Sequence, residues 1–178
     1  MLNVSCSRAP IHEKLADQKI FGFAKHVRET DHLELFMYGG GMWEQINSFN
    51  IGFISKELVG IDEARVMYID LSNRFLNYIN SDSKLCEYSS VFPFTIEQLN
   101  LVIMYDPDLC NRPFINAVSM GPMYIPKRDR INYHQTDPST GESEIVLIEY
   151  YNKALEILKF QQFKNDMDAE LQCKNAFE

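Results

Sequence analysis

The sequence has 178 residues, of which 46% are hydrophobic and 24% charged, a composition typical of one globular domain and not of a disordered chain. Its formal net charge of -8, from 17 basic and 25 acidic residues, would repel phosphate backbones, so we expect no nucleic-acid partner. No apolar run approaches the roughly 18 residues that a membrane-spanning helix needs, so we expect no membrane span.

Three regions are expected along the chain: an N-terminal segment at 1–32, a core domain at 33–163 and a polar C-terminal tail at 164–178. Pro10 suits a first helical turn, and the pattern after it predicts a helix over 10–28. Cys6 follows residues that resemble the end of a lipoprotein signal. It would carry a lipid anchor, with a periplasmic or envelope location, only if a leader was removed; otherwise it is an ordinary cysteine of a cytoplasmic chain.

Two strands are predicted next, over 32–38 and 49–54, because apolar side chains alternate in both segments. Gly39–Gly41 should close the first strand as a tight turn, with Trp43 packed beside it. The triplet lacks the wider glycine spacing and the following lysine of a phosphate-binding loop. The alternative interpretation is a flexible loop in which Tyr38 and Trp43 hold a partner, since these aromatic residues are common binding anchors.

The most regular helical pattern covers residues 62–80, with Asp62 as the N-terminal cap and Asn80 as the terminator. Its apolar stripe recurs at intervals of three and four residues. Thr95 and Gln98 have the spacing of a capping box and predict a short helical turn. The apolar run at 99–105 predicts a central strand covered on both faces.

Further strands are predicted at 114–120, 123–125, 130–134 and 145–148, with a turn at 137–141 and a helix from about residue 149. Because strands occur in runs and do not alternate with helices, the order favours an α+β fold. We expect a single domain with a mostly antiparallel sheet of about five strands, packed by two or three helices.

Recognisable catalytic motifs are incomplete. Ser119 fits a relaxed nucleophile-elbow pattern, but Pro122 and further strand residues follow where that motif needs a helix. Asp106 and Asp108 begin like a calcium loop, but Cys110 takes a ligand position. The four cysteines are widely separated, and no two histidines have a convincing ligand spacing. We therefore expect no metal and no cofactor, and mostly free thiols.

Several segments resemble a family of small uncharacterised bacterial proteins. The likeness spans about residues 33–158 and includes the glycine triplet, an E-A-R helix, a P-F-T segment and a terminal Y-x-x-A-L-x-I helix. The segments that carry the likeness are 38–41, 50–53, 61–65, 75–80, 88–95 and 151–157, and the four motifs lie among them. Many members carry a signal peptide or a lipoprotein leader. The resemblance thus implies a shared fold and export to the envelope, but no activity, substrate or catalytic residue.

These observations favour a non-enzymatic interaction domain that binds a protein or peptide. The expected binding residues are Tyr38, Gly39, Gly40, Gly41 and Trp43. The alternative is a small hydrolase or transferase with a dispersed site that includes His134, so the sequence leaves enzymatic activity open and favours its absence. It does not predict the oligomeric state.

Overall fold

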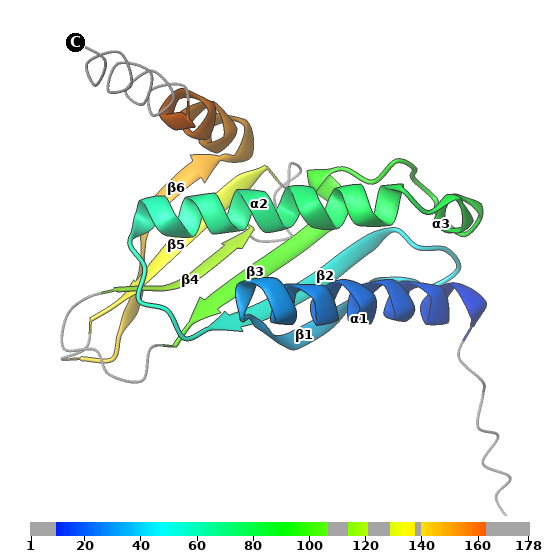
Figure 1. Ribbon diagram of the computed structural model, residues 1–178, viewed down its shortest axis with the longest axis horizontal. Helices are drawn as coiled ribbons and strands as arrows, with labels where there is room; N and C mark the ends of the chain where they lie inside the picture. Colours follow the sequence, from blue (N-terminus) through cyan, green and yellow to red (C-terminus); the bar gives the residue numbers. More distant parts are fainter. Residues whose placement is uncertain (1–9, 107–113, 121–128, 138–139, 163–178) are drawn as a thin grey trace, which may run out of the picture.

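The computed structural model of the protein describes residues 10–106, 114–120, 129–137 and 140–162. The helical elements are α1 (Ile11–Asp31), α2 (Ile61–Asn80), α3 (Ser83–Glu87), the 3₁₀ turn η1 (Ile96–Gln98) and a C-terminal helix at 151–162. The strands are β1 (Glu34–Gly41), β2 (Ser48–Ser55), β3 (Leu99–Tyr105), β4 (Phe114–Met120), β5 (Arg130–Thr136) and β6 (Ser143–Tyr150). Figure 1 shows α1 and α2 lying across the sheet.

All six strands form one sheet, in which neighbours along the chain are also neighbours in space, from β1 at one edge to β6 at the other. Only β2 and β3 are parallel, and α2 makes the crossover between them. The predicted α+β class and mostly antiparallel sheet are confirmed. The sheet has six strands, one more than the expected five, and the predicted strand at 123–125 lies outside the described residues.

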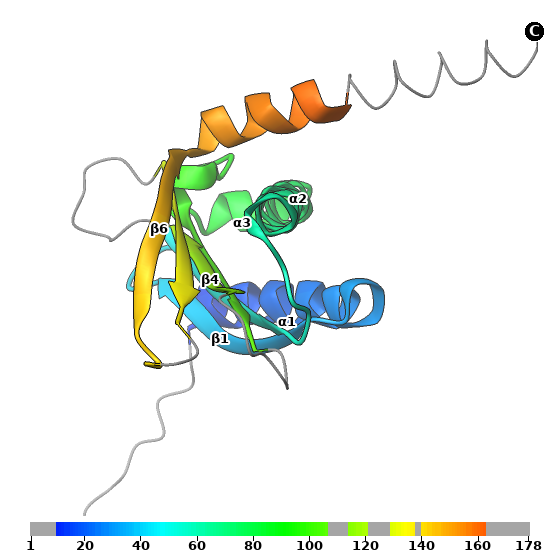
Figure 2. The same cartoon turned by 90° about the vertical axis from the view of Figure 1, so that its left-hand side faces the viewer.

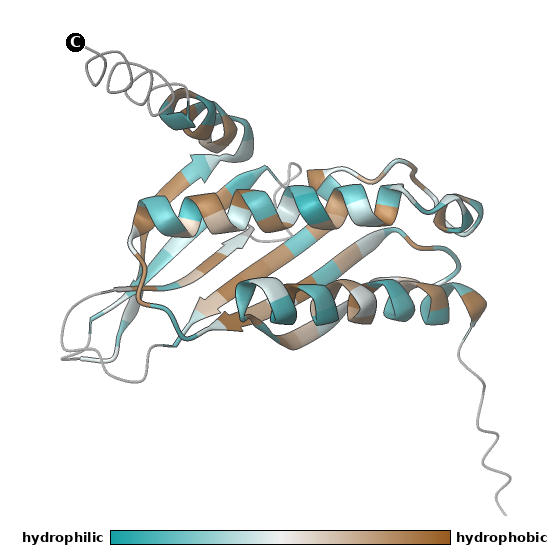
Figure 3. Cartoon of the chain, in the orientation of Figure 1, coloured by the Kyte–Doolittle hydropathy of each residue, from teal (hydrophilic) through white to brown (hydrophobic). Residues whose placement is uncertain are grey.

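The core lies between the sheet and one layer of helices, which Figure 2 shows on a single side of the sheet. The Phe23 ring of α1 lies 5.1 Å from Phe75 of α2 and 6.3 Å from Phe53 of β2. Phe49 lies 5.4 Å from Phe75 and 5.1 Å from Phe94. These edge-on contacts join both helices to the centre of the sheet. Hydrophobic and hydrophilic residues alternate around α1 and α2, as expected for helices with one buried side (Figure 3).

The other face of the sheet is covered by no described helix, and this contradicts one prediction. In β3, Leu101 and Ile103 are buried while Met104 is 40% exposed, so the strand alternates and is not covered on both faces. Its apolar run had suggested a fully buried strand because Val102 and Met104 are hydrophobic on the open face as well. The sequence pattern thus predicts burial of both faces of β3, whereas the structure buries only the face toward the helices.

The ends of α2 depend on residues that span the helix boundary. Gly60 is the N-terminal cap, and its N–H donates to the Glu63 carboxylate at 3.1 Å. The prediction of Asp62 as the cap is wrong, because Asp62 lies inside the first turn and pairs with Arg65. Asn80 ends the helix as predicted, and its side chain exchanges two 2.8 Å hydrogen bonds with the backbone of Phe94.

A buried arginine links α2 to the far strands of the sheet. Arg65 is only 6% exposed, and its Nε donates to Glu149 Oε1 of β6 at 2.8 Å. The Tyr133 hydroxyl of β5 donates to the same oxygen, and the Arg65 guanidinium lies 5.9 Å from the Tyr133 ring. Because each of these polar groups has a partner, the cluster avoids the large cost of an unpaired buried charge.

A second arginine links α2 to α1. Arg74 Nη2 lies 2.8 Å from Asp31 Oδ2, close to the end of α1. The hydrogen bond from Arg74 lowers the pKa of the Asp31 carboxyl below its ordinary value. The two arginines therefore tie α2 to elements on both of its sides.

Replacing Arg65 tests the first link. Arg65→Ala leaves Glu149 buried without its cation, so we expect a loss of about 3 to 5 kcal/mol in the free energy of unfolding, measured by urea denaturation. Lys56→Ala is the control, since it breaks an ion pair with Asp106 in which both side chains are mostly exposed. Equal effects of the two substitutions would contradict a structural role for the buried pair.

Candidate functional site

The glycine triplet lies inside strand β1 and does not form the predicted tight turn. Gly39, Gly40 and Gly41 pair with successive residues of β2, and the turn of this hairpin follows at residues 42–47. Asn47 N–H donates to Gly41 O at 2.7 Å and so closes that turn. The prediction failed because glycine is common in turns, whereas here it permits a close approach of two strands.

Gly40 has a clear steric reason to be glycine. A Cβ atom at this position would lie 2.0 Å from the carbonyl oxygen of Ser48, which is far inside contact distance. Gly39 adopts a φ of 149°, a conformation that residues with a side chain rarely adopt. The triplet therefore has a structural role in the strand, and it also leaves this end of β1 without bulky side chains.

The two aromatic residues of the predicted site are exposed. Trp43 follows β1 and is 90% exposed, so it does not pack beside the turn as predicted. Tyr38 is 51% exposed, and its ring lies 4.7 Å from the Phe21 ring of α1 in an edge-on contact. His12 of α1 contacts Met42 O at 2.8 Å through Nε2 and so holds the residue before Trp43.

β1 is an edge strand, with β2 on one side and no described strand on the other (Figure 1). The unpaired side of such a strand presents backbone N–H and C=O groups that can pair with another chain. We call Tyr38, Gly39, Gly40, Gly41 and Trp43 the β1 edge surface. Four of these five residues lie in the edge strand, and Trp43 follows them in the turn.

The residue of the alternative site, His134, lies within β5 opposite Ala117 of β4 and not at a hairpin tip. Its Nε2 lies 3.3 Å from Ser119 Oγ, a contact that a base and its serine could make. Burial lowers the pKa of His134, so the neutral imidazole is favoured near pH 7. Among the described residues, however, no carboxylate is hydrogen-bonded to this histidine, and such a group orients the base in serine hydrolases.

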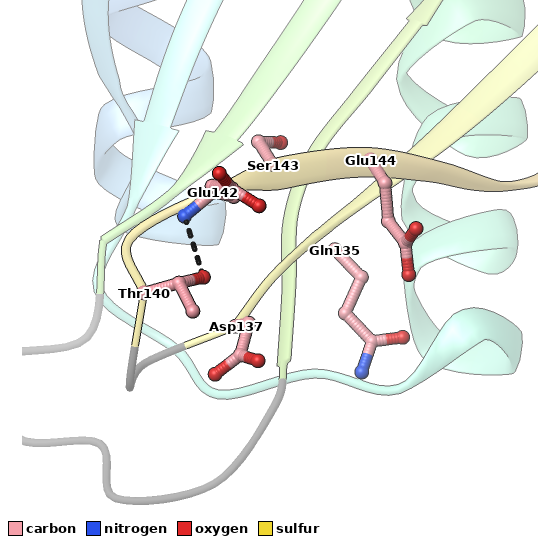
Figure 4. Close-up of a pocket in the computed structure, with 6 residues that line it drawn as sticks. All are labelled: Gln135, Asp137, Thr140, Glu142, Ser143 and Glu144. Carbon is pink, nitrogen blue, oxygen red and sulfur yellow. Dashed lines mark hydrogen bonds between the residues drawn. The ribbon is translucent and has the colours of Figure 1, made fainter.

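Sequence reasoning missed a hollow at the turn between β5 and β6. It has a volume of about 510 Å³, and Figure 4 shows its lining side chains gathered around the hairpin: Gln135, Asp137, Thr140, Glu142, Ser143 and Glu144. The Glu142 N–H donates to Thr140 Oγ1 at 3.2 Å. Three carboxylates make this end of β6 acidic, yet within the described part of the chain no three acidic, histidine or cysteine residues are grouped to hold a metal ion.

The remaining candidate residues are dispersed. Cys6, Cys110 and Cys173 lie outside the described residues, so the lipid anchor at Cys6 stays a prediction. Cys86 is an exposed free thiol at α3. None of the helices in the described ranges is long and apolar enough to cross a membrane.

Comparisons with known proteins give no relative. No family model matches the sequence, and no curated protein or solved structure matches it either.

The lowered pKa of His134 predicts a pH dependence of stability. Because the folded state favours neutral imidazole, the unfolded chain takes up a proton first as the pH falls below about 6.5. The His134 contribution is thus present above that pH and is lost as the pH falls toward the lower folded pKa. We expect His134→Gln to lose less stability than the wild type between about pH 7.5 and about pH 5 in urea denaturation.

The control is Val66→Ala, which changes an exposed side chain on α2 and removes no titratable group. It should keep the pH dependence of the wild type. If the wild type and His134→Gln lost equal stability over this interval, His134 would not be held neutral by burial.

Proposed function

We propose that this protein is a non-enzymatic interaction domain, which binds a protein or peptide at the β1 edge surface. The observation that carries the proposal is the exposure of Trp43, which is 90% accessible and is the only tryptophan of the chain. Tryptophan and tyrosine dominate the binding energy of many interfaces, because they bury a large rigid surface. Tyr38 supplies a second aromatic group, because it lies on β1 and Trp43 lies in the turn that follows β1.

The backbone of β1 suits an extended ligand. A peptide that adds to the edge of a sheet gains its affinity from main-chain hydrogen bonds and its specificity from alternate side chains. The glycine triplet has no side chains to obstruct an approaching strand. Phe21 supports the Tyr38 ring from α1, which limits the conformational freedom that binding would remove.

Trp43 fluorescence gives a direct test. We expect peptides selected from a random library against the immobilised protein to shift Trp43 emission to shorter wavelengths, because binding removes the indole from water. A Tyr38→Ala, Trp43→Ala double variant should bind these peptides at least about tenfold more weakly by titration calorimetry.

Val66→Ala is the matched control, since Val66 is 49% exposed on α2, away from β1. It should bind as the wild type does. Unchanged affinity in the folded double variant would place the binding surface elsewhere and refute the proposal.

A second candidate function is a small hydrolase or transferase, and it is favoured by the 3.3 Å contact of Ser119 Oγ with His134 Nε2. The pair has the spacing of a nucleophile and its base, but its strand position differs from the turn that exposes a catalytic serine in an elbow motif. We therefore rank it below the interaction domain.

A fluorophosphonate probe, which reacts with activated serines, separates the two candidates. We expect the wild type to remain unlabelled, because no described carboxylate orients His134. Labelling that is lost in both Ser119→Ala and His134→Gln would support the enzyme and contradict the interaction domain as the sole function.

A further inference from the structure

The face of the sheet away from the helix layer carries a row of polar residues on β5. Arg130, Asn132 and His134 alternate along this strand, so their side chains project from one face. Tyr133 faces α2, so the row faces the other way. Ser119 of β4 lies opposite Asn132, and its Oγ lies 3.3 Å from His134 Nε2. We call Arg130, Asn132, His134 and Ser119 the polar row.

The side-chain amide of Asn132 lies in a nearly buried position. Asn132 is only 6% exposed, yet its side chain makes no hydrogen bond with any described residue. Its neighbours across the strands are Ser119, whose hydroxyl contacts His134, and the apolar Ile148. Buried side-chain amides in folded proteins are ordinarily hydrogen-bonded, because an unpaired polar group is costly. A ligand that reaches this amide would therefore gain a hydrogen bond that the protein itself does not supply.

Arg130 is the charged member of the polar row. Its guanidinium lies 5.5 Å from the Tyr150 ring, and within the described ranges its side chain has no ion pair or hydrogen bond. Contact with the face of a ring restricts the arginine side chain and leaves its N–H edges free. Those edges match a carboxylate, which accepts two parallel hydrogen bonds from arginine. In a chain with a net charge of -8, this arginine makes a local site for an anion.

We propose that the polar row binds a small organic acid. The carboxylate accepts hydrogen bonds from the Arg130 guanidinium and the Asn132 amide. Because Ser119 lies directly across from Asn132, a hydroxyl a few bonds away from the carboxylate reaches the serine hydroxyl. On β6, Ile145 and Ile148 pair with residues of the row and are 49% and 54% exposed. They offer an apolar surface to the carbon chain of the acid.

The charge and the burial of the polar row limit what it can bind. Burial lowers the pKa of His134, so near pH 7 the imidazole is neutral and Arg130 is the only cation of the row. One cation balances a carboxylate, whereas a phosphate group carries up to about two negative charges at pH 7. The small exposed fraction of Asn132 admits a group of a few atoms and not the surface of a folded protein.

This site is separate from both candidate functions described above. Three strands lie between β1 and β5, so binding at the polar row does not use the β1 edge surface. It also requires no reaction of Ser119, because the serine hydroxyl serves here only as a hydrogen-bonding group. Loss of peptide binding or of probe labelling would therefore leave this inference intact.

Titration of the full chain with glycolate, 3-hydroxybutyrate and 4-hydroxybutyrate, followed by NMR of the side-chain amide groups, tests the proposal. We expect at least one of these acids to shift the Asn132 amide signals saturably, with a dissociation constant in the millimolar range or below. The methyl ester of the same acid has no charge and should not bind. Inorganic phosphate should bind more weakly than the acid.

Two substitutions in the polar row identify the groups that hold the acid, with calorimetry as the readout. Arg130→Gln removes the cation, and Asn132→Asp supplies a carboxylate that competes for Arg130, so each should weaken binding at least about tenfold. Lys14→Gln is the matched control, because it removes a cation that is exposed on α1, and it should bind as the wild type does. Circular dichroism confirms that each variant is folded.

Three results would overturn the inference. The first is the absence of a saturable shift with any of the three acids up to roughly 100 mM. The second is unchanged affinity in folded Arg130→Gln, which would show that the acid binds elsewhere. The third is tighter binding of inorganic phosphate than of every acid, which would contradict the choice of a carboxylate.

Discussion

The buried pairing of Arg65 with Glu149 is the constraint on which the arrangement of helix and sheet depends. α2 is the crossover between the parallel strands β2 and β3, so its position over that pair follows from chain connectivity. Nothing in connectivity fixes it to β5 and β6, which come later in the chain. The Arg65 guanidinium does so, through Glu149 and beside Tyr133. Together with Arg74 and Asp31, it holds one helix to both flanks of the core.

The two edge strands of the sheet, β1 and β6, present backbone groups that pair with no described strand. The core is complete between α1, α2 and the sheet, and the described interior holds no assembled nucleophile, base and acid. β1 has exposed aromatic side chains beside a glycine backbone, whereas the exposed side chains of β6 are mainly aliphatic. The proposed peptide site lies at the first of these two edges.

The sequence predicts elements whose pattern is local. It does not predict the burial or position of a residue whose partner is distant in the chain. The stripe of α2 and the Thr95 capping box depend on neighbours within four residues, and both are correct. The burial of Arg65 follows no local pattern, because its partner Glu149 is 84 positions away. The glycine triplet was misplaced for a similar reason, since the obstacle to a side chain at Gly40 is the Ser48 carbonyl of the next strand. The binding role of the candidate residues stays a prediction, and the position of Tyr38 and the glycine triplet on an edge strand could not be read from the sequence.

A double-mutant cycle on Arg65 and Glu149, measured by urea denaturation of Arg65→Met, Glu149→Gln and the combined variant, tests the central claim most directly. If the buried pair holds α2 to the far strands, the combined loss of stability should be smaller than the sum of the single losses by more than about 1 kcal/mol. Additive losses would contradict this account, because they would mean that the two side chains stabilise the fold separately.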